Sequence, residues 1–466
     1  MGTPSTNSSL RQRLIEFMGG ETLDQATAVY LTHSDGCQFD RKELRQSGEL
    51  DWFLERRMDI ARSLADKESY LFHLDIEYVN FDSPAEVYMD PWRSFDLQEP
   101  VIHVIETLLL GWGIRPLHLV TGQGHHFVWR IPRDSEITRR IRALDPAPEL
   151  TPLCLRRLPP ALVGAITAQD QSAFAAIALL AEFVAARIKA DAAPLSQIPV
   201  EITAVHVGPG CTRRREMISI DISEYGDPLH TRMTRMPFTH YRKPWVTGLI
   251  RHLGIEDQVP AFRTIPLHEI DVRQALKVRQ DEADVLDLAQ RACVRIPCQE
   301  QGTRHLLEDY LGSPLRRFHE TFYADRHDPR EHWPRTYART DLSALAPCAR
   351  HLLVFPNDLL LKPAGIQLVT RNLLALDWHP RHIAGLIRSK FEDPVFGWGV
   401  DWGDYEPATR ADFYTRLFAG LHLTGVDRLI DFNCTSTQEK GFCFPPGTGA
   451  CSLESARAHL LNRLPP

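Results

Sequence analysis

Two acidic residues separated by a single position, Asp75 and Glu77, are the first candidates for chemistry in this chain. They stand in segment 69–80, which is rich in β-branched and aromatic residues and alternates as a strand does. Side chains at positions i and i+2 of a strand share a face at roughly 6–7 Å, and two carboxylates brought together repel each other. Mg²⁺ or Mn²⁺, which prefer hard oxygen ligands, would remove this repulsion. The pair therefore predicts a metal site; the alternative is an edge strand with solvated acids.

A glycine-containing turn followed by two histidines is the second candidate group. It is the segment 121–126 (TGQGHH), which lies between predicted strands at 117–121 and 126–131. Glycine lets the backbone approach a ligand closely, and a histidine directly after such a turn can donate a hydrogen bond to a phosphate oxygen. His126 is the candidate for this contact, while His125 faces the other side of the strand. The alternative is a tight hairpin with an incidental histidine pair.

A third acid, Asp221, ends the apolar run 217–221 (MISID). A lone acid at the end of a strand is usually a cap or turn residue, so its value depends on the other two acids. The chain around it is basic: positions 207–251 hold eight Lys and Arg against four Asp and Glu, whereas the whole chain has a net charge of −7. A local excess of positive charge suits a phosphate backbone, and a solvated basic loop is the alternative.

Four of the nine cysteines stand late in the chain, at Cys348, Cys434, Cys443 and Cys451. Their spacing differs from the paired CxxC of a zinc ribbon and from the tight cysteine run of a bacterial ferredoxin. An odd number of cysteines in a chain without an apolar leader predicts a reducing compartment, in which grouped cysteines are first candidates for metal ligands. Widely spaced thiolates on helices and loops can still converge on one metal group.

The order of the first three groups resembles the three-motif signature of the archaeo-eukaryotic primase superfamily. In that signature an acidic strand and a Gly-x-Gly turn with histidine are followed by an Asp-ended strand and an Arg-x-Pro stretch, here 235–239 (RMPFT). The resemblance covers residues 65–245, although the interval 131–215 is long for the pattern. It implies an RRM-like sheet and two-metal transfer of nucleotides on a template. The implied residues are Asp75, Glu77 and Asp221 as catalytic ligands of Mg²⁺ or Mn²⁺, and Thr121, Gly122, Gly124, His126, Arg235 and Lys243 at the incoming nucleotide.

The tail carries a second and less specific resemblance. A helical pattern over 341–466, with Pro-Cys at 347–348 and Gly-x-Cys-x-Pro at 441–445, is similar to the iron–sulfur domain of the primase large subunit. This resemblance implies a [4Fe–4S] cluster on Cys348, Cys434, Cys443 and Cys451. Two alternatives stay open: a Zn²⁺ site that uses His351 with these cysteines, and cysteines that are simply buried as small apolar residues.

The elements that must position these residues change in type along the chain. Residues 10–66 read as mainly helical, and 132–165 as an insertion rich in proline and arginine. Period-2 patterns predict strands, and patterns with a period of 3.6 predict helices. The predicted strands are 69–80, 117–121, 126–131, 215–222 and 231–238, and the main predicted helices are 99–113, 169–190, 281–293, 303–311, 367–376, 380–391 and 410–421.

These elements predict an α+β fold in which an all-α part follows the sheet. The expected domains are a primase-type catalytic domain over 1–275 with its motifs at 65–245, a helical linker region over 276–340, and a helical cysteine domain over 341–466. The RRM-like sheet of the first domain follows from the resemblance rather than from the pattern.

Composition excludes several classes of protein. The chain has 466 residues, of which 43% are hydrophobic and 24% charged, so it is neither disordered nor collagen-like as a whole. Its most apolar segment, 173–186, is interrupted by Glu182 and is shorter than the ~18 residues of a membrane span. It therefore predicts a buried helix. The polar N-terminus leads us to expect a cytoplasmic protein without a membrane partner.

The leading interpretation is a single-chain DNA primase that also extends primers as a DNA polymerase. Its expected partners are a single-stranded DNA template, nucleoside triphosphates, and a helicase or another replication or defence protein. The tail is expected to hold the initiating nucleotide or the primer 5′ end while the front part catalyses. Two other interpretations stay open: a non-catalytic nucleic-acid-binding protein of the same fold, and a metal-dependent phosphodiesterase that shares only the carboxylates.

Overall fold

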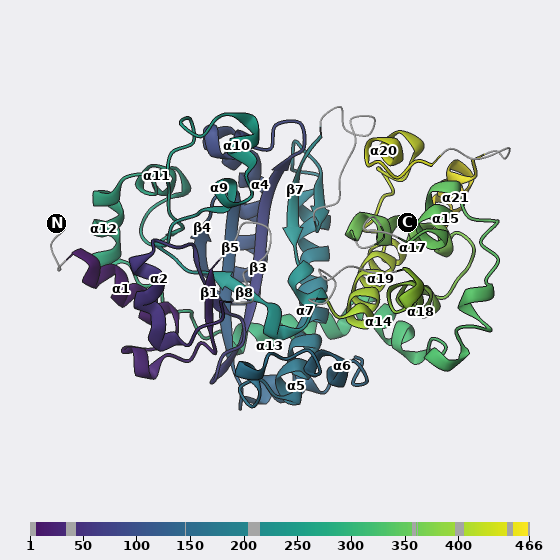
Figure 1. Ribbon diagram of the computed structural model, residues 1–466, viewed down its shortest axis with the longest axis horizontal. Helices are drawn as coiled ribbons and strands as arrows, with labels where there is room; N and C mark the ends of the chain where they lie inside the picture. Colours follow the sequence, from purple (N-terminus) through teal and green to yellow (C-terminus); the bar gives the residue numbers. More distant parts are fainter. Residues whose placement is uncertain are drawn as a thin grey trace.

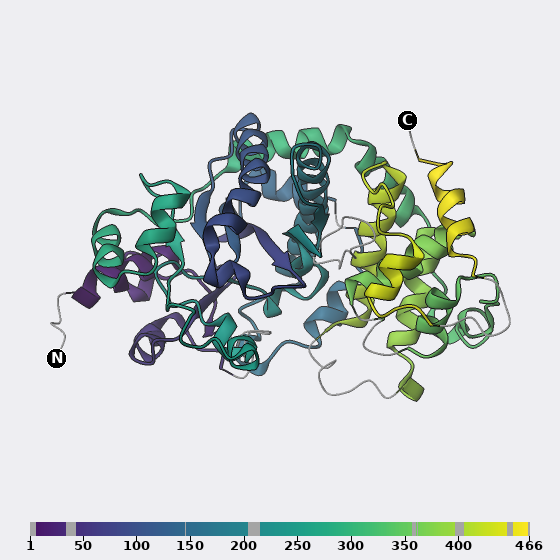
Figure 2. The same ribbon diagram turned by 90° about the horizontal axis from the view of Figure 1, so that it is seen from above.

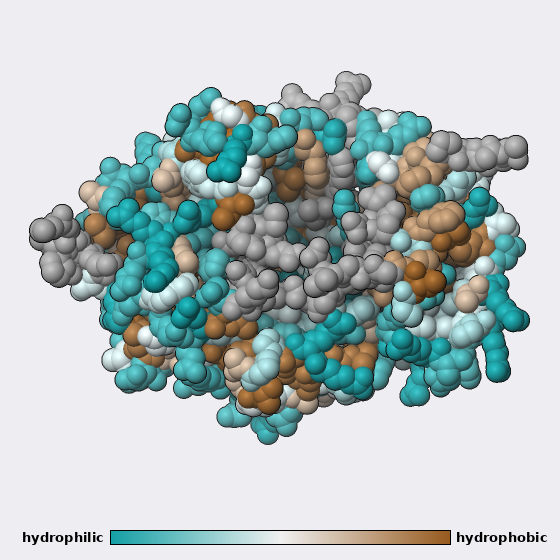
Figure 3. Space-filling model, in the orientation of Figure 1, coloured by the Kyte–Doolittle hydropathy of each residue, from teal (hydrophilic) through white to brown (hydrophobic). Residues whose placement is uncertain are grey.

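The computed structural model describes residues 6–33, 43–144, 146–203, 215–356, 360, 362–396, 405–444 and 451–464. The N-terminal part forms a mixed sheet with covering helices, and the C-terminal part is a helical tail beside it (Figure 1). The predicted α+β class is confirmed at this level. Hydrophilic residues cover much of the visible described surface of both parts, with apolar residues scattered among them (Figure 3).

The main sheet has six strands in the order β6-β7-β3-β5-β4-β9. Its long strand β3 (Ser69–Asn80) pairs antiparallel with β5 (Gly124–Pro132) on one side and with β7 (Glu216–Asp221) on the other. Residues 69–74 of β3 are buried, and beyond them only one face stays buried while the face that carries the acids is partly open. Three shorter strands complete the sheet: β4 (Leu117–Val120), β6 (Val200–Ile202, parallel to β7) and β9 (Ile265–Pro266).

Two long helices pack together and against β3 (Figures 1 and 2). They are α4 (Pro91–Gly111), between β3 and β4, and α7 (Ala168–Ala192), between β5 and β6. A capping box starts α7, because Thr167 and Asp170 each accept the other's backbone N–H. Its alanine-rich sequence is buried along most of its length, as predicted for 173–186. Within the described ranges, every helix is too short or too polar to cross a lipid bilayer.

The mainly helical expectation for residues 10–66 is wrong in part. Helices α1 (Thr6–Phe17) and α2 (Leu50–Glu55) are present, but strands β1 (Leu31–His33) and β2 (Ile60–Ser63) also form there. They join β8 (Met233–Arg235) in a small antiparallel sheet of order β1-β2-β8. One of the two partners of β2, the strand β8, comes from a distant part of the chain. The local sequence pattern therefore did not predict this small sheet.

Shorter helices surround the sheet. The region 132–165, expected as an insertion, contains α5 (Glu136–Arg142) and α6 (Thr151–Leu155), and both pack on α7 as part of the body of the fold. The helix α13 (Glu300–Gly312) packs on α5, α7 and β5. The others are α3 (Glu86–Met89), α9 (Lys243–Val246), α10 (Leu249–Leu253), α11 (Val272–Val278) and α12 (Glu282–Arg291).

The tail is built around α19 (Pro407–Leu423), which is buried along almost its whole length. It packs against α14 (Pro314–Ala324), α17 (Pro363–Leu374) and α18 (Pro380–Phe391). All four helices have proline in the first turn, where its missing N–H costs no hydrogen bond. The remaining tail helices are α15 (Pro347–Val354), α20 (Cys434–Glu439) and α21 (Leu453–Leu461).

A buried ion-pair group joins the tail to the body of the fold. Glu182 of α7 accepts a hydrogen bond of 3.1 Å from the Nε of Arg416 on α19, and it lies 3.1 Å from His319 Nε2 on α14. Burial favours protonation of Glu182, but Arg416 and His319 outweigh it and lower its pKa. The one acid inside the apolar segment 173–186 therefore anchors the tail.

Candidate active site

The register of the sheet brings the three predicted acids together. Asp75 of β3 lies directly opposite Asp221 of β7 and, on its other side, opposite His126 of β5. Glu77, two residues further along β3, lies opposite Ser219 and Gly124. Residues that stand opposite each other in an antiparallel pair project to the same face. The structure therefore places Asp75, Glu77, Asp221 and His126 on one face of the sheet.

Asp75 is the best-compensated acid of the group. Its Oδ1 lies 3.3 Å from His126 Nε2, although this oxygen is buried and has no hydrogen bond of good geometry among the described residues. Burial alone would raise the pKa of Asp75, but His126, His73 and Lys243 outweigh it and lower the pKa to about 2. Asp75 is thus an ionised carboxylate in a largely buried position, which is the form that a divalent metal ion requires.

Burial and the crowding of the acids raise the pKa values of the other two, Asp221 and Glu77. Burial, together with the charges of Asp75 and Glu77, raises the pKa of Asp221 to about 6, even though the Ser223 N–H donates a 2.8 Å hydrogen bond to it. Burial also raises the pKa of Glu77; Lys243 opposes the shift and Asp75 adds to it. Carboxylates with raised pKa values at one place are typical of sites whose charge is balanced by a cation.

Lys243 and Arg235, the two predicted cationic contacts, lie at the edge of this group. Lys243 Nζ lies 3.3 Å from Glu77 Oε1. Arg235 donates a 2.7 Å hydrogen bond to the buried Asp59, and its guanidinium lies over the ring of Tyr241 at 4.4 Å. Both are therefore held by side chains of the chain itself, with Lys243 directly beside the acids.

The basic run 207–251 is less free than its composition predicts. Within it, Arg213 and Arg214 lie outside the described residues. Arg215 lies 3.5 Å from Asp82, and Arg232 pairs with the buried Asp227. Several of its basic side chains thus form ion pairs within the protein and do not combine into one continuous cationic surface.

The predicted glycine turn is packed against the protein itself. A Cβ at Gly124 would lie 1.9 Å from the carbonyl oxygen of Ile76, and a Cβ at Gly122 would lie 2.3 Å from the ring of Tyr241. The hydroxyl of Thr121 accepts a 3.3 Å hydrogen bond from the Gly124 N–H and closes the turn. The close approach that these glycines allow is therefore to β3 and to Tyr241, and their contact with a nucleotide stays a prediction.

Two residues at this face were missed by the sequence reasoning. His73 stands two positions before Asp75 on β3, and its Nδ1 lies 2.8 and 2.9 Å from the carboxylate oxygens of Glu224. The His73 ring meets the ring of His126 edge to face at 4.7 Å, and its Nε2 is buried without a hydrogen-bond partner among the described residues. The i−2 position of His73 was a signal in the sequence, whereas nothing marked Glu224.

The structure also brings the four late cysteines near one another. Burial raises the pKa of Cys348 to about 12, and the nearby Cys451 and Cys443 add to the shift. Burial and the neighbouring Cys451 raise the pKa of Cys434 to about 11. Cys443 and Cys451 thus lie within electrostatic reach of Cys348. His351, the alternative zinc ligand, stacks on Phe444 with ring centres 3.5 Å apart.

Neither group has the geometry of a closed metal site as it stands. Among the described residues, no three His, Cys, Asp or Glu side chains converge closely enough to hold an ion without adjustment. The donor types nevertheless fit: oxygen donors at the sheet suit Mg²⁺ or Mn²⁺, and thiols in the tail suit an iron–sulfur cluster or Zn²⁺.

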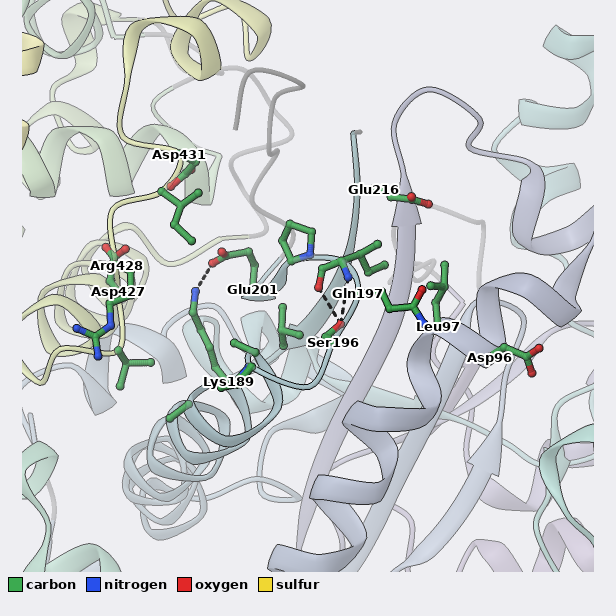
Figure 4. A pocket seen from close by; sticks show the side chains of 18 of the residues that line it. Asp96, Leu97, Lys189, Ser196, Gln197, Glu201, Glu216, Asp427, Arg428 and Asp431 are labelled. Carbon is green, nitrogen blue, oxygen red and sulfur yellow. Dashed lines mark hydrogen bonds and ion pairs between the residues drawn. The ribbon is translucent and has the colours of Figure 1, made fainter. Parts of the chain in front are cut away.

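A large cavity lies elsewhere, between the sheet edge and the tail (Figure 4). It has a volume of about 1520 Å³ and is bordered by the start of α4, the end of α7, β6 and segment 424–431. Lys189 and Glu201 form an ion pair on its wall, and Asp427 and Asp431 face them from the tail. The described lining includes none of the residues predicted for catalysis or for the cysteine site.

Comparison with known proteins returned no match to a protein-family model, to a curated protein or to a solved structure.

Proposed function

We propose that this chain is a template-dependent nucleotidyltransferase that synthesises primers on single-stranded DNA and extends them, of the archaeo-eukaryotic primase type. The observation that carries the proposal is the register of β3, β5 and β7, which gathers Asp75, Glu77, Asp221 and His126 on one face. His126 and Asp221 are far from Asp75 and Glu77 in the sequence, and all four belong to the motifs that resemble those of primases.

The order of the elements supports the same proposal. Apart from short helices and the strand β6, which lies between α7 and β7, the elements β3-α4-β4-β5-α7-β7 follow the succession β-α-β-β-α-β. Their strands stand side by side in the order β7-β3-β5-β4. This is the arrangement expected of an RRM-like catalytic sheet. The acids project from two strands that are neighbours in that order, β3 and β7.

The acids suit the metal that such a reaction needs. Asp75, Glu77 and Asp221 would hold Mg²⁺ or Mn²⁺, which when bound supplies positive charge to the attacking and leaving oxygens of phosphoryl transfer. The buried Oδ1 of Asp75, which lacks a hydrogen bond of good geometry among the described residues, and the raised pKa of Asp221 fit this role.

The other residues of the face would then bind the triphosphate. His126 lies beside Asp75, so a phosphate oxygen near the acids is within reach of its ring nitrogen. Lys243 sits beside Glu77 and would add a positive charge to the phosphates. Arg235 would influence the triphosphate through its charge and without direct contact, because its guanidinium is bound to Asp59.

In the tail we propose that Cys348, Cys434, Cys443 and Cys451 hold a [4Fe–4S] cluster, with Zn²⁺ as the competing occupant. The contributions of Cys443 and Cys451 to the raised pKa values of Cys348 and Cys434 support a shared site. The proposed role of the tail is to hold the initiating nucleotide or the primer 5′ end.

The test is synthesis on single-stranded DNA with ribo- or deoxynucleotides and with Mg²⁺ or Mn²⁺. The proposal predicts new chains from unprimed template and longer chains from primed template, both lost in Asp75→Asn. Release of nucleotides from the DNA instead would identify a phosphodiesterase. Template binding without any turnover would identify a non-catalytic binding protein.

A further inference from the structure

The loop that follows β7 closes the side of the acidic group. Three consecutive residues after Ile222 bind the face: the Ser223 N–H donates to Asp221, Glu224 pairs with His73, and the Tyr225 hydroxyl bonds the backbone of His73. This loop forms the short 3₁₀ turn η4 (Ser223–Gly226).

The Tyr225 contact has a clear structural reason. Pairing between β3 and β7 begins only at Asp75, so the β7 side of β3 has no strand partner at His73. There the His73 N–H donates to the Tyr225 hydroxyl at 3.0 Å, and that hydroxyl donates to the His73 carbonyl at 2.9 Å. One side chain thus replaces the missing strand next to the acids.

The tail grips the same loop from the outside. A Cβ on Gly226 would lie 2.7 Å from Cδ1 of Phe413 on α19, so the ring of Phe413 rests directly on this glycine. One turn earlier on α19, Arg410 lies 3.5 Å from Asp227 and packs over the rings of Tyr405 and Tyr414. Asp227 and Phe413 are both buried.

We propose that helix α19 of the tail positions Asp221 and the His73–Glu224 pair, with Phe413 and Arg410 as positioning residues that act through Gly226 and Asp227. This inference rests on the proposed function for its catalytic consequence, while the coupling itself is a property of the fold. It implies that the tail supports every nucleotide addition and not only initiation, because the loop is part of the catalytic wall.

The decisive variant is Gly226→Ala. The backbone at Gly226 lies outside the left-handed region, so alanine brings no backbone strain and adds only a methyl group against Phe413. The ring, α19 or the loop must then shift. The double variant with Phe413→Leu makes room for that methyl group and is the rescue. The matched control is Gly420→Ala on the same helix, whose Cβ would lie 3.0 Å from Leu315 and Phe318 of α14, within the tail.

Three measurements on the full chain test the proposal. Hydrogen exchange of peptides that cover 70–78 and 221–228 reports the loop, Mn²⁺ binding followed by electron paramagnetic resonance reports the acids, and extension of an annealed primer reports catalysis. We expect Gly226→Ala to speed exchange in both peptides, to weaken Mn²⁺ binding, and to slow extension by up to about 10²-fold, the effect of a displacement near 1 Å. Adding Phe413→Leu restores most of each loss, and Gly420→Ala leaves the loop unchanged.

Unchanged exchange and Mn²⁺ affinity in Gly226→Ala would overturn the proposal, as would equal losses in Gly420→Ala. A wild-type protein that adds no nucleotide would instead refute the proposed function, and the exchange and Mn²⁺ measurements would still decide whether α19 positions the loop.

Discussion

The three acids of the sheet and the four late cysteines of the tail are positioned by different kinds of structure. Strand pairing fixes Asp75 opposite Asp221, so backbone hydrogen bonds determine where these acids lie. In the tail, Cys348 stands in the first turn of α15 and Cys434 at the start of α20, while Cys443 and Cys451 are exposed and lie outside the helices. The sheet itself fixes the strand positions of the acids, whereas thiols on separate segments would depend on the proposed metal group to fix them.

Mutations at the two sites should therefore have different effects on activity and on local structure. Removing an acid from the sheet should remove chemistry and leave the fold, because the strands keep their register without it. Removing a thiol should remove both the metal group and local structure, because the ligand couples the segments. The following experiments test this contrast, beginning with the largest expected effect.

Asp75→Asn should lower nucleotide addition by at least about 10³-fold, because several kcal/mol of charge stabilisation by the metal are lost. The fold should persist, as followed by circular dichroism. The matched control is Asp82→Asn, an exposed acid just beyond the same strand. Full activity in the Asp75 variant would remove the metal site from the sheet.

Cys443→Ser should abolish the metal group of the tail. Protein purified without oxygen should be brown and hold roughly four irons per chain before the change, and lose both after it. Initiation on unprimed template should fall far more than extension of an annealed primer. Cys298→Ser, an exposed cysteine outside the group, is the control. A colourless wild-type protein with one zinc would replace the cluster by the zinc alternative.

His126→Ala should raise the nucleotide KM or lower kcat by about 10-fold to 10²-fold, the effect of losing one hydrogen bond to a charged group. Binding of single-stranded DNA should change little, because His126 faces the acids rather than an outer surface. His125→Gln is the comparison, since His125 projects to the opposite face and contacts His118 at 2.9 Å. Equal loss of DNA binding would give His126 a template or folding role.

Acidification should destabilise the junction between the two parts. The pKa of Glu182 is lowered by Arg416 and His319 against the effect of burial, and burial lowers the pKa of His319. Both groups bind protons more weakly in the folded state, so stability is lost as pH falls through the unfolded-state values, first ~6.5 for histidine and then ~4.3 for glutamate.

The measurement is Tm between pH 7.5 and 5, for the wild type and for His319→Gln. The wild type should lose stability over this interval, and the variant should lose less, because it has no histidine to protonate at that position. Glu308→Gln, an exposed acid, is the control and should follow the wild type. A pH profile of His319→Gln identical to that of the wild type would contradict the assignment.

Local patterns were sufficient for several of the long elements and for some of the candidate residues. The alternation in 69–80 predicted β3, and the helical periods predicted α7, α18 and α19 with bounds close to those observed. Asp75, Glu77 and His126 were candidates by their types and spacing, whereas Asp221 became one through the primase resemblance. Strands β1 and β2 were not predicted: they pair with each other, and β2 also pairs with β8, which lies far along the chain.

The sequence therefore determines the residue types and the face of its own strand or helix to which each side chain projects. Asp75 and Glu77 share a face because strand periodicity requires it. Three contacts follow from the tertiary structure and could not be read from the sequence. Asp221 lies opposite Asp75, Glu224 pairs with His73, and Phe413 packs on Gly226. These contacts join segments whose proximity depends on strand order and on the packing of the tail, and such long-range pairing leaves no periodic trace in the local sequence.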